Sequence, residues 1–239
     1  PACAAFELLN ISSYQANSAF DNKMGILNQE EKNSQFIAAM VTRELCCDLL
    51  RELEGQFDTL TIQNLCACLS KANKYIYLAQ HYDLNLLVLA NYENRYLDEK
   101  AYLADYIKRC FYGSGIFNGA IAHAGGLLGG SQGLRLRSLR EYGEHLGTGL
   151  QIINDLSDFV PSYWENMTGR CYQDELSDLR NGRLTFGVYR LLKGKALSAN
   201  NLKQMLYSPN RRCEEEMSEI ANKLIELGAV NDIATMSKR

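Results

Sequence analysis

Apolar residues recur along most of this chain at the three- and four-residue spacing of an α-helix. The run 34–53 carries them on one side: Phe36, Ile37, Met40, Val41, Leu45, Leu49 and Leu50. Residues at this spacing share one helix face, so the run predicts an amphipathic helix. The only prolines lie at positions 1, 161 and 209. Long stretches therefore contain no obligatory helix break.

The same periodicity predicts helices at 2–17, 61–79, 84–91, 98–111, 113–128, 134–158, 184–192 and 214–227. Two polar segments, 22–33 and 157–178, predict loops, and Gly228 predicts a helix stop. We find no period-2 strand and no internal repeat of fixed length. The sequence therefore predicts an all-α fold.

The composition narrows the class of protein. The 239 residues carry a formal net charge of −3, which argues against a nucleic-acid-binding protein driven by net charge. No apolar run is long enough to span a bilayer, and residues 1–5 lack the features of a signal peptide. The eight cysteines are scattered through helical segments, which predicts reduced thiols in a cytoplasmic protein.

The cysteines and histidines do not form a metal-binding pattern. The cysteine pairs at 46–47 and 66–68 are too close together, and no histidine lies at ligand spacing from them. A zinc site is therefore not predicted. We expect His81, His123 and His145 to be structural or exposed, because none has a paired cysteine or acid at ligand spacing.

An oxygen-rich stripe lies in the segment 147–158. Its members, three and four positions apart on one helix face, are Gln151, Asn154, Asp155 and Asp158. Carboxylate and amide oxygens are ligands that Mg²⁺ prefers. A solvated polar face is the alternative, but apolar residues surround the acids, and we expect the stripe to face a cavity.

This segment resembles the second aspartate-rich motif, G-x-x-F-Q-x-x-D-D-x-x-D, of the trans-isoprenyl diphosphate synthases, or polyprenyl synthetase family. Thr168-Gly169-Arg170 resembles the family's G-K stretch, and 178–185, which reads DLRNGRLT, resembles its D-L-x-x-G-K-x-T stretch. Upstream, Glu7-Leu8-Leu9 and the segment 17–21 lie where the family has E-L-x-H and its first D-D-x-x-D. The resemblance covers about residues 2–230.

The resemblance implies one isoprenoid-synthase-type domain over 1–239, an all-α helical bundle around a central cavity. The family's early G-G-K-R motif has no counterpart here, so we expect the N-terminal part of the family fold to be missing. The implied substrates are an allylic prenyl diphosphate and isopentenyl diphosphate, with Mg²⁺ holding the diphosphate. Family members are usually dimers, so a homodimer or a heterodimer with a related synthase is expected.

The resemblance also implies site residues. Those expected to be catalytic are Asp21, Gln151, Asp155 and Asp158, and those expected to hold metal are Asn17, Asp21, Asn154 and Asp158. Substrate binding falls to Lys23, Arg170 and Arg183, with Ser12 and Ser13 lining the tunnel for the growing chain. Asn17, Ser18 and Asn154 replace family acids. Magnesium binding should therefore be weak or absent, because each replacement removes a charge beside the cation.

Two functions follow from these features. In the first, the chain is a divergent prenyltransferase that elongates an allylic diphosphate with isopentenyl diphosphate. In the second, it is a non-catalytic homologue that acts as a regulatory or partner subunit of an intact synthase. The lost acids favour the second function, and the persistence of Gln151 and the basic residues favours the first.

Overall fold

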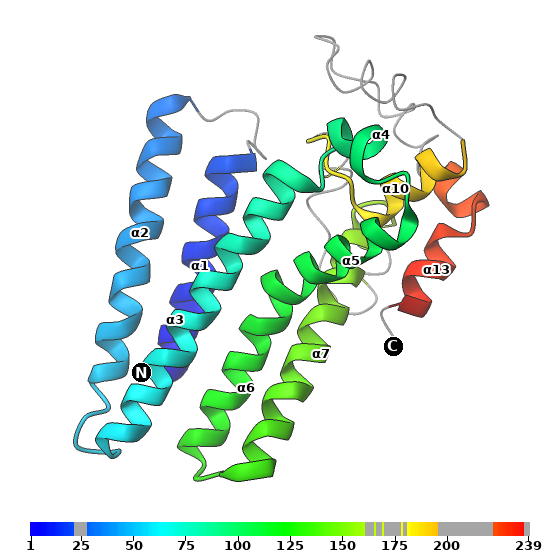
Figure 1. The fold of residues 1–239 in the computed structure, drawn as a ribbon. Coiled ribbons are helices and arrows are strands. Elements are labelled where there is room, and N and C mark those ends of the chain that lie inside the picture. Colours follow the sequence, from blue (N-terminus) through cyan, green and yellow to red (C-terminus); the bar gives the residue numbers. More distant parts are fainter. Residues whose placement is uncertain are drawn as a thin grey trace. The chain divides into compact units, whose positions relative to one another are not determined.

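The computed structural model describes residues 1–21, 28–160, 165, 169, 178, 181–195 and 222–236. Its α-helices are α1 (Ala2–Asp21), α2 (Gln29–Arg51), α3 (Thr59–His81), α4 (Tyr92–Arg95), α5 (Glu99–Cys110), α6 (Ile116–Leu128), α7 (Gly133–Ser157), α10 (Phe186–Lys193) and α13 (Ala229–Met236) (Figure 1). Two π-helical turns, η1 (Tyr82–Leu86) and η3 (Phe111–Gly115), and the 3₁₀ turn η2 (Leu89–Asn91) complete the set. Between these described residues the only β-type pairing is two isolated bridges, which confirms the all-α class.

The structure corrects two of the predicted elements. The segment 22–33 was predicted as a loop, but α2 begins at Gln29 because Asn28 and Glu31 form a capping box. The Asn28 side chain accepts from the Glu31 N–H at 2.9 Å, and the Glu31 carboxylate accepts from the Asn28 N–H at 2.8 Å. The predicted helix 84–91 is instead a π turn followed by a 3₁₀ turn. The predicted helix 214–227 lies mostly outside the described residues.

The chain divides into two compact units. Unit 1 comprises residues 1–80 and 111–147, and unit 2 comprises residues 81–110 and 148–239. In unit 1, α1 packs against α2 (Figure 1), and the buried Ser12 hydroxyl donates to the Ala39 carbonyl of α2 at 2.8 Å. An apolar cluster that includes Leu9, Leu50 and Leu65 forms the core of this unit.

Within unit 1, α6 and the first part of α7 approach closely because glycines lie where they meet. A Cβ placed on Gly143 would lie 2.5 Å from the Asn118 carbonyl oxygen and 2.9 Å from the Gly119 Cα. The absence of a side chain at Gly143 therefore permits this spacing. Gly125, on α6, differs, because a Cβ there would meet nothing within 4 Å.

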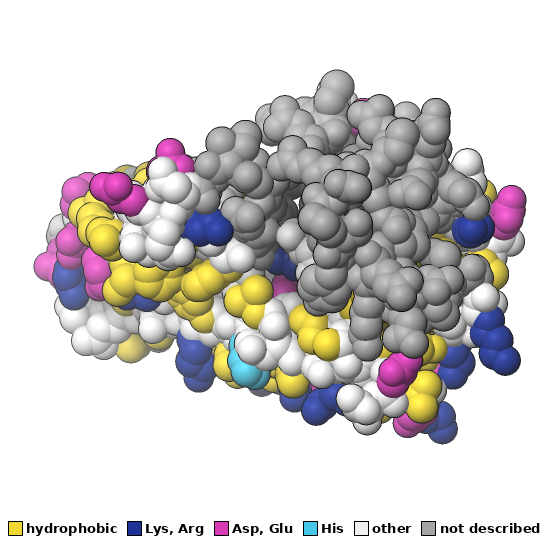
Figure 2. All heavy atoms as spheres, turned by 90° about the horizontal axis from the view of Figure 1, so that it is seen from above, with side chains coloured by type: hydrophobic (Ala, Val, Ile, Leu, Met, Phe, Trp, Pro, Cys, Tyr) yellow, Lys and Arg dark blue, Asp and Glu magenta, His cyan; other side chains and the backbone are white. Residues whose placement is uncertain are grey.

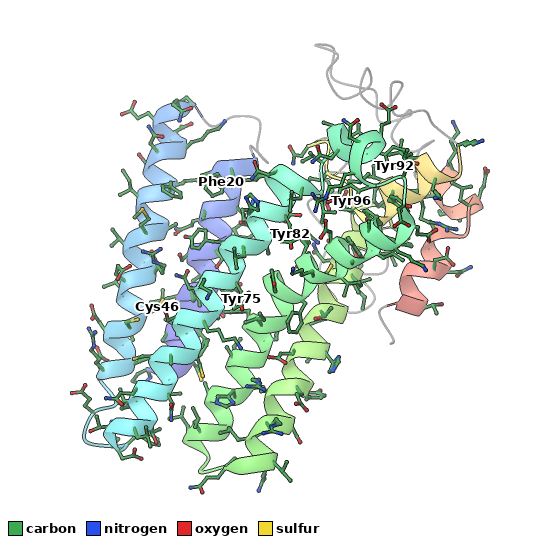
Figure 3. The ribbon with its side chains drawn as sticks, viewed as in Figure 1. Phe20, Cys46, Tyr75, Tyr82, Tyr92 and Tyr96 are labelled. Atoms are coloured by element: carbon green, nitrogen blue, oxygen red, sulfur yellow. The ribbon has the colours of Figure 1, made fainter. Side chains whose placement is uncertain are left out.

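The core of unit 2 is unusually rich in tyrosine. The rings of Tyr102 and Tyr189 stack with their centroids 3.8 Å apart and their planes 2° apart, and the ring of Tyr106 stacks with that of Tyr102 at a centroid distance of 5.8 Å. Tyr92 and Tyr96, labelled in Figure 3, lie on α4 and directly after it, and both are buried in the same cluster. Backbone pairing between 87–89 and 182–184 fixes the segment that enters α10.

The apolar side of α2 is only partly buried. Leu50 is buried, whereas Ile37, Met40, Val41 and Leu45 are 61%, 41%, 56% and 48% exposed. We call these four residues the α2 stripe. Hydrophobic side chains reach the surface among charged ones elsewhere too (Figure 2). Among the helices that the structure describes, none is long and apolar enough to cross a membrane.

The glycine contact gives a test of the packing. Gly143→Ala should lower the free energy of unfolding by about 1 kcal/mol or more, because overpacking costs ~1–3 kcal/mol and exceeds the gain in helix propensity. Gly125→Ala, in open space, should raise it by about 0.5–1 kcal/mol. Urea unfolding measures both. Equal effects of the two substitutions would mean that α6 and α7 do not meet at Gly143.

Candidate functional site

The oxygen-rich stripe forms the last turns of α7 in unit 2, and one of its carboxylates is held by an arginine. Arg109 of α5 donates from Nη1 to both carboxylate oxygens of Asp155, at 2.9 Å and 2.8 Å. Tyr106 donates its hydroxyl to Asp155 Oδ2 at 2.9 Å, and Gln151 donates its amide to Oδ1 at 3.0 Å. The Asp155 side chain is 1% exposed and that of Arg109 is 7% exposed. The pair is therefore buried and saturated with hydrogen bonds.

A second carboxylate holds the other edge of the guanidinium. Arg109 Nε donates to Asp83 Oδ1 of η1 at 2.7 Å. Although burial opposes the charge of Arg109, Asp155 and Asp83 together raise the pKa of this guanidinium well above its ordinary value. We call the set Asp83, Arg109 and Asp155 the buried triad. It joins η1, α5 and α7 by charge-assisted hydrogen bonds.

The Asp155 carboxyl responds to its surroundings in two opposing ways. Burial raises the pKa of Asp155 above its ordinary value, Arg109 lowers it, and the nearby Asp178 carboxylate raises it again. The hydrogen bonds from Arg109, Tyr106 and Gln151 all require an acceptor. They therefore favour the ionised form at neutral pH.

The last acid of the stripe belongs to a neighbouring network. Asp158 is buried, and its Oδ2 accepts from the Asp178 backbone N–H at 3.1 Å. Arg183 Nη1 in turn donates to Asp178 Oδ1 at 3.1 Å, and both of these side chains are buried. The structure thus brings Asp158 and Arg183 together through Asp178. Asn154, which directly precedes Asp155 in the chain, is half-buried and also interacts within the protein.

The residues of the first motif lie on α1 in unit 1. Ser12 is buried and bonded to α2, and the Ser13 hydroxyl donates to the Leu9 carbonyl at 2.8 Å. Asn17 is half-buried, and Ser18 donates to the Tyr14 carbonyl at 2.9 Å. The side chain of Asp21, and all of Lys23 and Arg170, lie outside the described residues. The roles assigned to these residues from the sequence stay predictions.

Two members of the site were not identified from the sequence: Tyr106 in its polar role, and Arg109. One signal was present for Arg109. In the helix predicted at 98–111, Tyr102 and Tyr106 lie four positions apart on one face, and Arg109 lies three positions after Tyr106, on the same face. A cation within an apolar stripe needs a buried partner. The sequence alone did not indicate which of the distant acids would be that partner.

Asp155 of the second motif is not free to bind a magnesium ion, and the ligand roles of Asn154 and Asp158 stay predictions. Mg²⁺ requires carboxylate oxygens that can turn toward it, yet both oxygens of Asp155 accept from Arg109. In the parts of the chain that the structure describes, no group of three or more His, Cys, Asp or Glu side chains is placed to hold a metal ion. The positive charge beside Asp155 is supplied by the protein itself.

Removing the arginine should show how strongly the triad holds the fold. Arg109→Met should lower the free energy of unfolding by about 3–5 kcal/mol, because it leaves a buried carboxylate unpaired. This loss of unfolding free energy should become smaller as the pH falls, because a buried carboxyl without a cationic partner is tolerated once it is protonated. Urea unfolding at several pH values measures both effects.

The control for this substitution is an exposed pair. Arg51 and Asp48 form an ion pair whose side chains are 65% and 64% exposed. Arg51→Ala should cost about 0–1 kcal/mol. If Arg109→Met fails to fold, Arg109→Met with Asp155→Asn should restore folding, because Asp155 is the more deeply buried of the two acids that lose their partner, at 1% exposed against 12% for Asp83. A single variant no less stable than Arg51→Ala would show that the triad does not form.

Comparison with known proteins places the fold and the family. A sequence model of the polyprenyl synthetase family matches residues 28–224. No curated protein sequence matches the chain. Among solved structures, a polyprenyl synthetase from Streptomyces coelicolor A3(2) superimposes with a TM-score of 0.74 at 20% identity, covering 100% of this chain and 69% of that one.

Two further structures show the same fold. A decaprenyl diphosphate synthase from Rhodobacter capsulatus gives a TM-score of 0.72 at 15% identity, covering 99% of this chain and 68% of its own. A polyprenyl synthase from Caulobacter crescentus CB15, complexed with calcium and isoprenyl diphosphate, gives a TM-score of 0.74 at 15% identity. The match covers 99% of this chain and 68% of that one. Because the family match extends over well more than half of its length, the chain belongs to the polyprenyl synthetase family.

Proposed function

We propose that this chain is a non-catalytic member of the family that acts as a partner subunit of a related prenyl diphosphate synthase. Membership of the family supports a trans-prenyltransferase-like function in general. One observation carries the narrower proposal: the carboxylate of Asp155 is bound on both oxygens by the buried Arg109. A side chain committed in this way is not available to a diphosphate-bound cation.

The energetic cost of separating Arg109 from Asp155 favours the state in which the two remain paired. Separating a buried ion pair costs about 3–5 kcal/mol, because it leaves an uncompensated charge. A metal ion would have to displace Arg109 from Asp155 and also leave the guanidinium with Asp83 alone. Asn154, next to Asp155 in the chain, is neutral and offers no compensating charge.

The α2 stripe supports the pairing part of the proposal. Ile37, Val41 and Leu45 follow one another at four-residue spacing and are about half exposed, and Met40 lies beside them. Contiguous apolar side chains of this kind on a helix face are typical of protein–protein contacts. A second helical subunit, either a copy of this chain or a related synthase, would bury them.

Prenyl transfer by the chain itself is the second candidate function. It would bind an allylic prenyl diphosphate and elongate it with isopentenyl diphosphate. The retained motif residues Gln151, Asp158 and Arg183 favour it, since they keep the family's residue types or charges at their positions. It requires Arg109 to release Asp155, and Arg183 to release Asp178, when substrate binds.

A pyrophosphate-release assay separates the two functions. The chain alone, with MgCl₂, isopentenyl diphosphate and allylic diphosphates of increasing length, should release no pyrophosphate above the blank, because the triad holds the acid that a catalytic cluster needs. An active synthase of the family serves as the positive control. Magnesium-dependent release that disappears in Asp155→Asn would establish the enzyme and overturn the proposal.

The same preparation tests the partner role. Mixed with a related synthase from its own source, the chain should form a complex and change the length of the prenyl chain that the synthase makes. Val41→Glu should weaken subunit pairing by placing a charge in the α2 stripe. Leu60→Glu, on α3 and 65% exposed, is the matched control. Sedimentation analysis measures subunit pairing in both variants. Equal pairing in the two would show that α2 is not part of the interface.

A further inference from the structure

A cavity of ≈ 180 Å³ lies in unit 1, between α3, α6 and α7. It is lined by Asn64, Ala67, Cys68, Lys71, Ile116, Ala120, His123, Arg140 and Glu144. None of these residues belongs to the aspartate-rich or basic motifs. The cavity is therefore a feature that the family resemblance and the proposed function leave unexplained.

The charged groups around the cavity give it a positive balance. Lys71 and Arg140 are cations, and Glu144 is the single carboxylate among the lining residues. The Arg140 Nε and the nearest Glu144 oxygen are 3.6 Å apart, so the pair is only loosely formed. Burial, and then the charges of Arg140 and Lys71, lower the pKa of His123. The imidazole is therefore neutral at neutral pH, and the lining retains a net positive charge.

Two nitrogen atoms of these lining residues lack partners. Arg140 Nε and His123 Nδ1 are buried, and neither has a hydrogen-bond partner within the described part of the protein. A buried polar atom without a partner is costly, and most such atoms in folded proteins are satisfied. The Arg140 side chain is 40% exposed, so the cavity is reached from solvent. A guest that accepts hydrogen bonds would satisfy Arg140 Nε, and it would satisfy His123 Nδ1 once the imidazole is protonated.

Three further lining residues are apolar, and a fourth is a neutral thiol. Ala67, Ile116 and Ala120 contribute only hydrocarbon. Burial raises the pKa of the Cys68 thiol, so this group is neutral at physiological pH. The two cations argue against a metal ion in the same space. The space is smaller than a drug-sized ligand pocket, which holds ~300–1,000 Å³.

We propose that this cavity binds a small oxyanion, a phosphate or a short-chain carboxylate, with the charged end against Lys71 and Arg140. A hydrocarbon part, where the ligand has one, lies against Ala67, Ile116 and Ala120. Arg140 supplies the directional N–H donors that suit a planar or tetrahedral oxyanion, and Lys71 adds a point charge. Glu144 limits affinity, since its carboxylate repels the ligand unless it stays with Arg140.

Occupancy should be reported by His123. An anion beside Lys71 and Arg140 offsets the two charges that disfavour the imidazolium, so the pKa of His123 should rise when the site is filled. The charged and titratable groups that face this ring are Lys71 and Cys68 from α3 and Arg140 and Glu144 from α7. By linkage, the anion should bind more tightly as the pH falls through the His123 pKa.

The experiment is an NMR pH titration of the histidine Cε1–H signals. The chain has three histidines, and His81 and His145 are exposed, which makes them internal controls. Inorganic phosphate and butyrate are added separately, with chloride at matched ionic strength. We expect one or both anions, at millimolar concentration, to raise the His123 pKa while His81 and His145 titrate as in chloride. A response of His123 to phosphate but not to butyrate would identify a phosphate site. A response to butyrate but not to phosphate would identify a carboxylate site.

Variants assign the effect to the cavity. Arg140→Met should weaken anion binding by about tenfold or more, as expected for a hydrogen bond between charged groups. Lys71→Met should weaken binding less. Arg137→Met, an exposed arginine on the same helix outside the cavity, should leave binding unchanged, and thermal unfolding checks that each variant is folded. No change at His123 with either anion, or an unchanged response in Arg140→Met, would overturn the proposal.

Discussion

The buried triad of Asp83, Arg109 and Asp155 is the interaction on which the rest of unit 2 depends. A guanidinium that is 7% exposed can be tolerated only where carboxylates satisfy it on both edges. η1, α5 and α7 must therefore meet in one arrangement. The tyrosine stack follows from the same constraint. Tyr106 both packs against Tyr102 and donates to Asp155, so the apolar core and the ionic core share a side chain.

The triad also shows that residues of a family motif can hold the protein's own structure together. Gln151 and Asp155 keep the family's residue types, but here they bind to each other and to Arg109. Packing and hydrogen bonding within the protein are thus enough to require a particular residue type at a motif position. Asp158, Asp178 and Arg183 repeat the pattern, because a basic residue expected to contact substrate forms a buried pair within the protein. A motif read from sequence indicates residue types, whereas function depends on which groups remain available.

The fold was predictable because helical periodicity is local, and the site was less so because its contacts are distant. Arg109 and Asp155 are 46 positions apart, and no spacing rule links them. The start of α2 was a different failure: the capping box of Asn28 and Glu31 was present in the sequence but was not recognised. The α2 stripe shows a further limit. Periodicity identified its apolar side, but burial depends on which neighbours cover it, and α1 covers a different face that includes Ala39.

The two units differ in how their charges are balanced. In unit 2, the carboxylates of Asp83, Asp155 and Asp178 surround Arg109 and Arg183, and the direct hydrogen bonds leave the acid–base pairs complete. In unit 1, the cavity of α3, α6 and α7 holds more cations than carboxylates, and its one ion pair is loose at 3.6 Å. Ion pairs with direct hydrogen bonds hold the fold together. Charged groups that lack such a partner are the ones to which an external ion would bind most favourably. On this electrostatic ground, the cavity is where we propose that an anion binds, because its lining carries more positive than negative charge.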